Sequence, residues 1–321
     1  MKLFLQFILV SVLVACGFRV GAQDPPIPVE FHPIRIDVPA ELEKVRGNGS
    51  SKIPFGFNLG QSVRFQQVFH ASQFSKLPQG GAFLTRFQDI RGACGSLIVA
   101  AGFTNVEMRF SSISRGPDGL SSVFSENVGD DEVLVFKGRM GAGSGAACDR
   151  GFGGTGIWML QSPFFYDPTK GRNLLLELRV SDPNYIEGGK QVTMETHSVT
   201  NDSISRVAAF SSTATTADVV DTAGLIATFI FFRPPAFKVH IETNHVVVLW
   251  QGDLPQFQLQ MSDEPGSMSK WVPYPEQLPY REIVNYVTLP IASLQHQRYF
   301  RLFWDSPQPG LVIPPRTTSS Q

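Results

Sequence analysis

Alternation of apolar and polar side chains dominates the chain from about residue 56 onward. In residues 105–113, Val106, Met108 and Phe110 alternate with polar residues, which predicts a strand with one buried face. Segments of similar character cover residues 62–69, 82–87, 133–136, 157–160, 174–180, 191–196, 206–210 and 225–232. Turn clusters rich in Gly, Pro and Asp separate them, and no long amphipathic helix intervenes. The pattern predicts an all-β protein built around a large, jelly-roll-like β-sandwich.

Two local features depart from plain alternation. Within residues 62–69 the pattern breaks at Gln67 and Val68, which predicts a β-bulge. Residues 40–46 favour one helical turn, which the glycines at 47 and 49 end.

A second, smaller domain is predicted after Arg233, where Pro234 and Pro235 form the best boundary in the chain. Five compact strands follow, at residues 237–242, 245–250, 257–262, 284–289 and 299–304. Their spacing fits a small immunoglobulin-like β-sandwich. The predicted organisation is a signal peptide at 1–22, an extended lead-in at 23–55, the large sandwich at 56–232, a proline linker at 233–236, the small sandwich at 237–305 and a flexible tail at 306–321.

The N-terminus has the pattern of an export signal. An apolar run of residues 3–15 follows Lys2, and Val20-Gly21-Ala22 predicts cleavage before Gln23. A second interpretation is a bacterial lipobox ending at Cys16, whose lipidation would anchor the chain. No stretch of the chain holds 18 consecutive apolar residues, so no transmembrane span is predicted in the mature chain. Both interpretations place the protein outside the cytoplasm, secreted or at the cell envelope.

Composition narrows the class of partner. The 321 residues carry 27 basic and 28 acidic side chains, and charged residues make up only 17%. Removal of residues 1–22 leaves 25 basic and 28 acidic residues. This balance gives no electrostatic reason to expect nucleic-acid binding.

The two cysteines of the mature chain are predicted to form a disulfide. Cys94 and Cys148 lie in Gly-rich stretches, and an even pair in an exported protein is typical of one bridge. In the chain-entropy model such a loop stabilises the fold by about 4 kcal/mol. Metal ligation is the alternative, although no paired His or Cys residues lie nearby in the sequence.

The acidic run around Asp130 and Asp131 is a candidate calcium site, and no other cofactor is predicted. A solvated turn is the simpler interpretation, because the run lacks the spacing of an EF-hand loop. The loop around Ser144 lacks the Gly-x-Ser-x-Gly pattern of a nucleophile elbow. No catalytic residue is therefore predicted.

Aromatic side chains offer a second candidate site. Trp158 and Tyr166 would stack on sugar rings if their faces were exposed. Strand alternation buries about half of such residues, so a place in the core is the competing interpretation.

Two parts of the chain resemble known proteins. Val63–Phe74, Gly119–Gly129 and Ser162–Glu177 are similar to segments of uncharacterised exported proteins of environmental bacteria. This resemblance covers about residues 60–232 and implies export and a β-sandwich, with no known reaction. Val247–Trp250 and Tyr299–Trp304 resemble a fibronectin type III or immunoglobulin-like module. Such modules usually act as spacers or adhesive units, but a fold by itself does not decide function.

These features together predict an exported, non-enzymatic protein that acts in binding, adhesion or surface structure at the cell envelope. Its expected partner is a glycan or a cell-surface protein. The alternative is a secreted carbohydrate-active enzyme or its accessory carbohydrate-binding module, in which two carboxyl groups would face one cleft.

Overall fold

A computed structural model describes residues 10–12, 33–55, 61–90, 99–144, 158–182, 193–233, 238–242, 244–251, 257–263, 270–274, 284–290 and 298–304. These residues form two compact units, which divide between Arg233 and Pro234. The N-terminal unit contains residues 33–233, and the C-terminal unit contains the described residues from 238 to 304 together with residues 10–12. No helix in the described ranges is long and apolar enough to cross a membrane.

Strands make up nearly all the regular structure, which confirms the all-β prediction. The strands of the N-terminal unit are β2 (Ile34–Val38), β3 (Gly49–Ser51), β4 (Val63–Phe69), β5 (Ala82–Ile90), β6 (Val99–Ile113), β7 (Val133–Ser144), β8 (Trp158–Tyr166), β9 (Asn173–Asp182), β10 (Met194–Ser198), β11 (Ile204–Ala209), β12 (Val219–Asp221), β13 (Ala223–Leu225) and β14 (Ala227–Phe232). In the described part of this unit, four short 3-10 helices accompany them: η1 (Ala40–Leu42), η2 (Ala71–Phe74), η3 (Phe124–Glu126) and η4 (Pro168–Lys170). The predicted helical turn is therefore present as η1, but it is shorter than residues 40–46.

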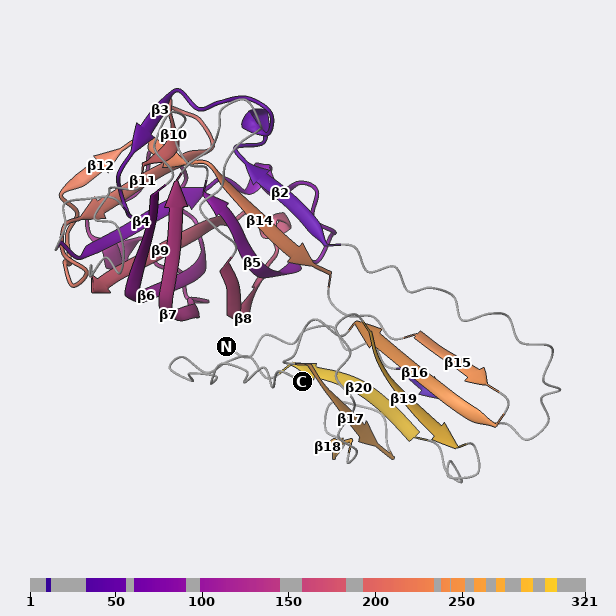
Figure 1. Cartoon of the computed structure of the whole chain (residues 1–321). Helices are drawn as coiled ribbons and strands as arrows, with labels where there is room; N and C mark the ends of the chain where they lie inside the picture. Colours follow the sequence, from indigo (N-terminus) through magenta and orange to yellow (C-terminus); the bar gives the residue numbers. More distant parts are fainter. Residues whose placement is uncertain are drawn as a thin grey trace. The chain divides into compact units, whose positions relative to one another are not determined.

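Two antiparallel sheets form the body of the N-terminal unit (Figure 1). One has the strand order β12-β11-β4-β9-β6-β7, and the other has the order β2-β14-β5-β8. A three-stranded sheet, β13-β10-β3, adds to them. Because the side chains of a strand point alternately to its two faces, each main sheet supplies one apolar face to a shared core.

The main core is rich in phenylalanine. Phe229 on β14 is fully buried, and its ring centroid lies 5.0 Å from that of Phe69, 5.3 Å from that of Phe87 and 5.6 Å from that of Phe74. Edge-to-face and tilted ring pairs of this kind add to the stabilisation from burial alone. Ten of the 26 phenylalanines of the chain belong to this core.

Strand β4 is regular, so the predicted bulge at Gln67 and Val68 is wrong. β4 pairs with β9 and with β11 across residues 63–69 without a register shift. Gln67 is fully buried, and its side-chain amide donates to the carbonyl oxygen of Leu225 (2.9 Å) and accepts from the Leu225 N–H (2.8 Å). A polar side chain can occupy this buried position because its amide donates one hydrogen bond to the Leu225 backbone and accepts one from it, as the backbone of a neighbouring strand would.

The predicted extended lead-in at residues 23–55 is partly wrong as well. β2 lies inside it and pairs antiparallel with β14, and Ile36 and Val38 on β2 belong to the main core. β3 pairs with β10. The prolines of this region led the sequence prediction away from a strand, yet they fall outside the paired residues of β2.

The C-terminal unit is a small two-sheet structure with its own core. Its strands are β1 (Val10–Val12), β15 (Lys238–Glu242), β16 (His245–Gln251), β17 (Phe257–Ser262), β18 (Val272–Pro273), β19 (Val284–Pro290) and β20 (Arg298–Trp304). The sheets have the orders β15-β16-β19 and β1-β20-β17-β18. Val246, Val248, Leu259, Val287 and Phe300 form the core. The predicted small sandwich is present, with β1 from the N-terminal segment as an additional edge strand.

Candidate functional site

The six-stranded sheet carries an ordered set of polar side chains on its outer face, the face opposite the main core. Phe65, Leu178 and Met108 on β4, β9 and β6 belong to the main core, so their chain neighbours point outward. Two rows of outward residues cross the three strands: Gln66, Glu177 and Arg109 in one row, and Arg64, Arg179 and Glu107 in the next. Strand alternation and register together bring these residues side by side.

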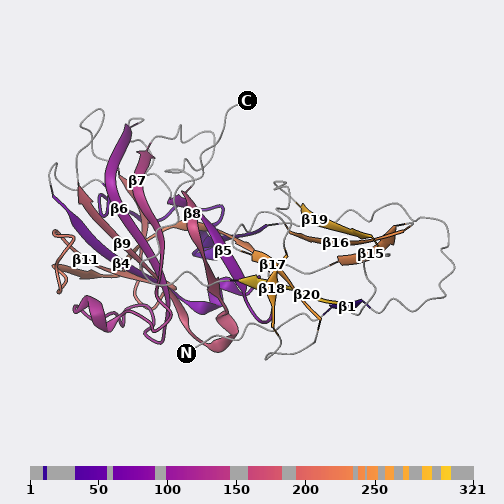
Figure 2. The same cartoon turned by 90° about the horizontal axis from the view of Figure 1, so that it is seen from below.

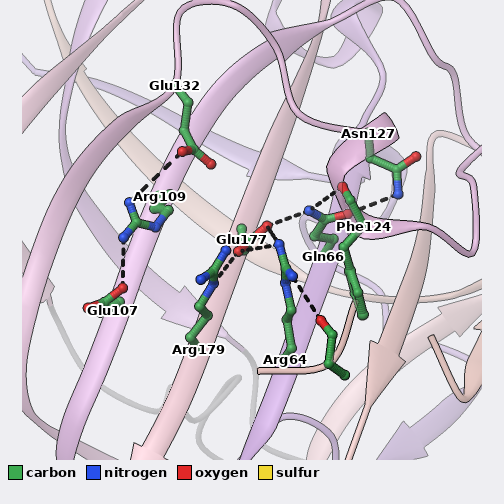
Figure 3. Close-up of polar contacts among 10 residues, drawn as sticks. Arg64, Gln66, Glu107, Arg109, Phe124, Asn127, Glu132, Glu177 and Arg179 are labelled. Atoms are coloured by element: carbon green, nitrogen blue, oxygen red, sulfur yellow. Dashed lines mark hydrogen bonds and ion pairs between the residues drawn. The ribbon is translucent and has the colours of Figure 1, made fainter. Parts of the chain in front are cut away.

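Glu177 lies at the centre of this set and is only 1% exposed. Its carboxylate accepts a hydrogen bond from Arg64 (3.2 Å) and further hydrogen bonds from Gln66 and Arg179 (Figure 3). A buried carboxylate is costly unless donors surround it. Here three donors from two adjacent strands satisfy it.

The Glu177 cluster also holds the covering loop that contains η3. The Arg64 guanidinium donates to the Ala214 carbonyl (2.8 Å) and lies 4.5 Å above the Phe124 ring. Gln66 donates to the Phe124 carbonyl (3.2 Å) and accepts from the Asn127 amide (2.9 Å). Part of the outer face is therefore covered, and the hydrogen bonds of Arg64 and Gln66 join the covering loop to the sheet.

Another part of the outer face is partly exposed to solvent. Arg109 contacts Glu107 (Nη2 to Oε2, 2.7 Å) and Glu132 (Nη1 to Oε2, 3.9 Å). Lys137 on β7 contacts the second oxygen of Glu107 at 2.8 Å. The side chains of Arg179 and Lys137 are 32% and 45% exposed. The ion pairs of this face form two groups, and we refer to their seven residues together as the charge lattice. One group is Arg64, Glu177 and Arg179, and the other is Glu107, Arg109, Glu132 and Lys137.

The two more exposed acids of the lattice have opposite pKa shifts. Burial acts to raise the pKa of Glu107, but the hydrogen bonds and charges of Lys137 and Arg109 together hold it below its usual range. Burial, followed by repulsion from Glu177, raises the pKa of Glu132 despite the nearby arginines. Glu107 is thus the stably ionised acid of the pair, and Glu132 takes up a proton more readily.

The surface has a positive excess. Arg139 lies two residues beyond Lys137 on β7, on the same face, and is exposed, with no ion pair among the described residues. With Arg139, the face carries five cationic and three acidic side chains, a net charge of +2 when all are ionised. The whole chain has a net charge of −1. The outer face therefore concentrates positive charge in a weakly acidic protein.

The two aspartates proposed for calcium have different partners in the structure. Asp130 pairs with Arg172 at 2.6 Å on the surface, and the hydrogen bond and charge of that arginine lower the Asp130 pKa. Asp131 accepts a hydrogen bond from the Ser112 N–H at 2.7 Å. The described residues contain no group of three His, Cys, Asp or Glu side chains placed to hold a metal. Calcium binding at these aspartates remains an untested prediction.

The two aromatic residues proposed for sugar stacking lie in the core. Trp158 is 6% exposed and stacks on Phe87, with ring centroids 5.4 Å apart. Tyr166 is fully buried, and its hydroxyl donates to the Arg172 carbonyl at 2.8 Å. The condition for stacking, an exposed ring face, is not met at either residue. The competing interpretation, a place in the core, describes both.

Three predicted positions fall outside the described residues. These are Cys94 and Cys148 of the predicted disulfide and Cys16 of the alternative lipobox. The disulfide and the lipidation therefore stay predictions.

The charge lattice was not predicted from the sequence, although the sequence contains a pattern that points to it. Glu177 and Arg179 interrupt the apolar run of residues 174–180 at alternate positions, and Arg64 and Gln66 do the same in residues 62–69. Charges at alternate positions in two strands indicate one polar face on each. Only the pairing of β4 with β9 shows that these two faces are the same face.

Comparison with known proteins found no relative of this chain. No family model, no curated protein and no solved structure matches the chain. The charge lattice is therefore interpreted from its own geometry.

Proposed function

We propose that the chain is an exported, non-enzymatic binding protein of the cell envelope, and that the charge lattice binds an anionic glycan. The observation that carries this proposal is the set of partly exposed cations on β9 and β7, the two strands on either side of β6 in one sheet. Arg179, Lys137 and Arg139 supply that set. The signal-peptide pattern and the all-β architecture support the same class of function.

The geometry suits a ligand with repeated negative charges. β9 and β7 lie on either side of β6, so two strand spacings of about 4.8 Å separate their cations across the sheet. Guanidinium groups bind carboxylates and sulfates through paired, charge-assisted hydrogen bonds. A glycan with charged groups about 10 Å apart can therefore contact both strands at once.

The acids of the lattice help to orient these cations. Glu107 accepts from Arg109 and Lys137, and Glu177 accepts from Arg179. Holding long cationic side chains in place before binding reduces the entropy lost when the ligand binds. The lattice thus combines preorganised cations with exposed positive charge.

The test is a binding titration of the chain with polygalacturonate, with neutral dextran as the reference glycan. Arg139→Glu should weaken polygalacturonate binding by about tenfold or more, because Arg139 is exposed and its charge reversal leaves the buried cluster intact. Lys170→Glu is the matched control, since Lys170 is also exposed and lies on η4, away from the outer face.

The expected pattern includes a fall in affinity with added salt. Equal effects of Arg139→Glu and Lys170→Glu would refute a role for the lattice. Binding of polygalacturonate no tighter than binding of dextran would refute the proposal as a whole.

One observation favours the alternative, a secreted carbohydrate-active enzyme. Glu107 and Glu132 flank Arg109 and have opposite pKa shifts, and a glycosidase needs such a separation between its acid and its ionised partner. Release of reducing ends from a glycan, abolished by Glu132→Gln, would establish this alternative. Absence of release across a panel of neutral and acidic glycans would remove it.

A further inference from the structure

The three acids of the charge lattice are held by their partners to different degrees. Glu177 is buried and accepts hydrogen bonds from three donors. Glu107 contacts Arg109 at 2.7 Å with one carboxylate oxygen and Lys137 at 2.8 Å with the other. Glu132 has a single ion pair among the described residues, with 3.9 Å between its Oε2 and Nη1 of Arg109. Of the three acids, Glu132 therefore loses the least when its carboxylate takes up a proton.

The position of Glu132 makes it accessible to protons and exposes it to the charges of the whole face. It directly precedes β7, the strand at the end of the six-stranded sheet, beside β6 (Figure 2). Its side chain is 31% exposed. The charged groups that act on it are Arg109 on β6, Glu177 and Arg179 on β9, and Arg64 on β4. Burial and repulsion from Glu177 outweigh the arginines, so the pKa of Glu132 lies above its usual range.

The acids next to Glu132 in the chain have partners of their own. Asp130 pairs with Arg172, and Asp131 accepts a hydrogen bond from the Ser112 N–H. Neither interaction involves Glu132, so proton uptake by Glu132 leaves both in place.

Proton uptake by Glu132 makes the outer face more positive. With all its groups ionised the face has five cationic and three acidic side chains, and a proton on Glu132 leaves five cationic and two acidic ones, a change from +2 to +3. Arg109 then keeps Glu107 as its ion-pair partner, and Lys137 and Arg139 on β7 stay exposed. A more positive face attracts an anionic ligand more strongly.

We propose that the affinity of the charge lattice for an anionic glycan rises as the pH falls, because Glu132 takes up a proton. This regulation rests on the proposed function, since it concerns the same site. The protein then holds its glycan more tightly in acidic surroundings than in neutral ones.

The test measures binding of the chain to dextran sulfate at neutral pH and at about pH 5, just above the usual range of a glutamate. Sulfate groups stay ionised at both pH values, so the charge of the probe is constant. On acidification, the affinity of the parent should rise about three- to tenfold more than that of Glu132→Gln, because one unit of charge is added within about 10 Å of the binding cations. Histidine titration acts on both proteins alike and cancels in this comparison.

Two further variants serve as controls. Glu107→Gln also removes one acid from the outer face, but it should keep the pH response because Glu132 is still present. Glu43→Gln removes an exposed acid next to η1, which contacts β2 of the other main sheet, and it should behave as the parent does.

The possible failures are distinguishable. An equal rise in affinity in the parent and in Glu132→Gln would overturn the regulation and leave the proposed function standing. A pH response lost in Glu107→Gln and kept in Glu132→Gln would assign the proton to Glu107 and also overturn it. Binding of dextran sulfate no tighter than binding of neutral dextran at both pH values would refute the proposed function itself.

Discussion

Replacement of Glu177 by Gln tests the idea that the buried acid holds the outer face together. Gln has nearly the same shape, but it removes the negative charge and turns one of the two acceptor oxygens into a donor. Arg64, whose side chain is 10% exposed, then loses its counter-charge. Gln66, fully buried, loses an acceptor for its amide.

The expected cost follows from the burial of each partner. Breaking a buried charge pair from one side destabilises a protein by about 3–5 kcal/mol. The lower end applies here, because Arg64 keeps the Ala214 carbonyl and Arg179 is 32% exposed to water. For a unit of about 200 residues, about 3 kcal/mol corresponds to a fall of roughly 6–12 °C in melting temperature.

Differential scanning calorimetry of the whole chain measures this change. The two units have separate cores, so the transition of the N-terminal unit should move while that of the C-terminal unit stays in place. Asp130→Asn is the control, because it breaks an ion pair with Arg172 whose side chains are 65% and 47% exposed and should leave the melting temperature unchanged. A shift of less than about 2 °C for Glu177→Gln in a folded variant would refute the assigned role.

Three further changes probe neighbouring features. Gln67→Leu leaves the buried N–H and C=O of Leu225 without partners and should cost about 2 kcal/mol in urea denaturation, whereas a neutral result would contradict the strand-like role of this amide. Because the pKa of Glu132 is raised in the folded state, the free energy of unfolding falls as pH rises through that pKa. Glu132→Gln should therefore have the same free energy of unfolding as the parent at low pH and a higher one at neutral pH. Parallel profiles of stability against pH for the two proteins would count against this. A Cβ at Gly129 would lie 2.2 Å from the Ser112 carbonyl oxygen, so Gly129→Ala should lower the melting temperature, and an unchanged value would show that the loop can move away.

Local patterns in the sequence were sufficient for the fold class and most strand positions. The two-residue period of a half-buried strand is visible within a few residues, so β9 and the C-terminal part of β6 were predicted close to their observed places. The segment Ile34–Val38 also alternates, yet it was predicted as a lead-in because prolines surround it. That error was one of interpretation, since the period was present in the residues.

The sequence by itself determined that the chain is all-β, that a boundary follows Arg233 and that charged side chains alternate with apolar ones in the strands. These properties depend on side-chain type and on near neighbours, so a local reading suffices. Only the tertiary structure decided that β4, β9 and β6 are adjacent, which brings Arg64, Glu177 and Arg109 together on one face. It also decided that Trp158 lies in the core and that Glu177 is buried. The physical reason is that burial and charge pairing depend on contacts between residues far apart in the sequence, such as Arg64 and Glu177, which are 113 positions apart. Strand register over such separations follows from the packing of the whole core.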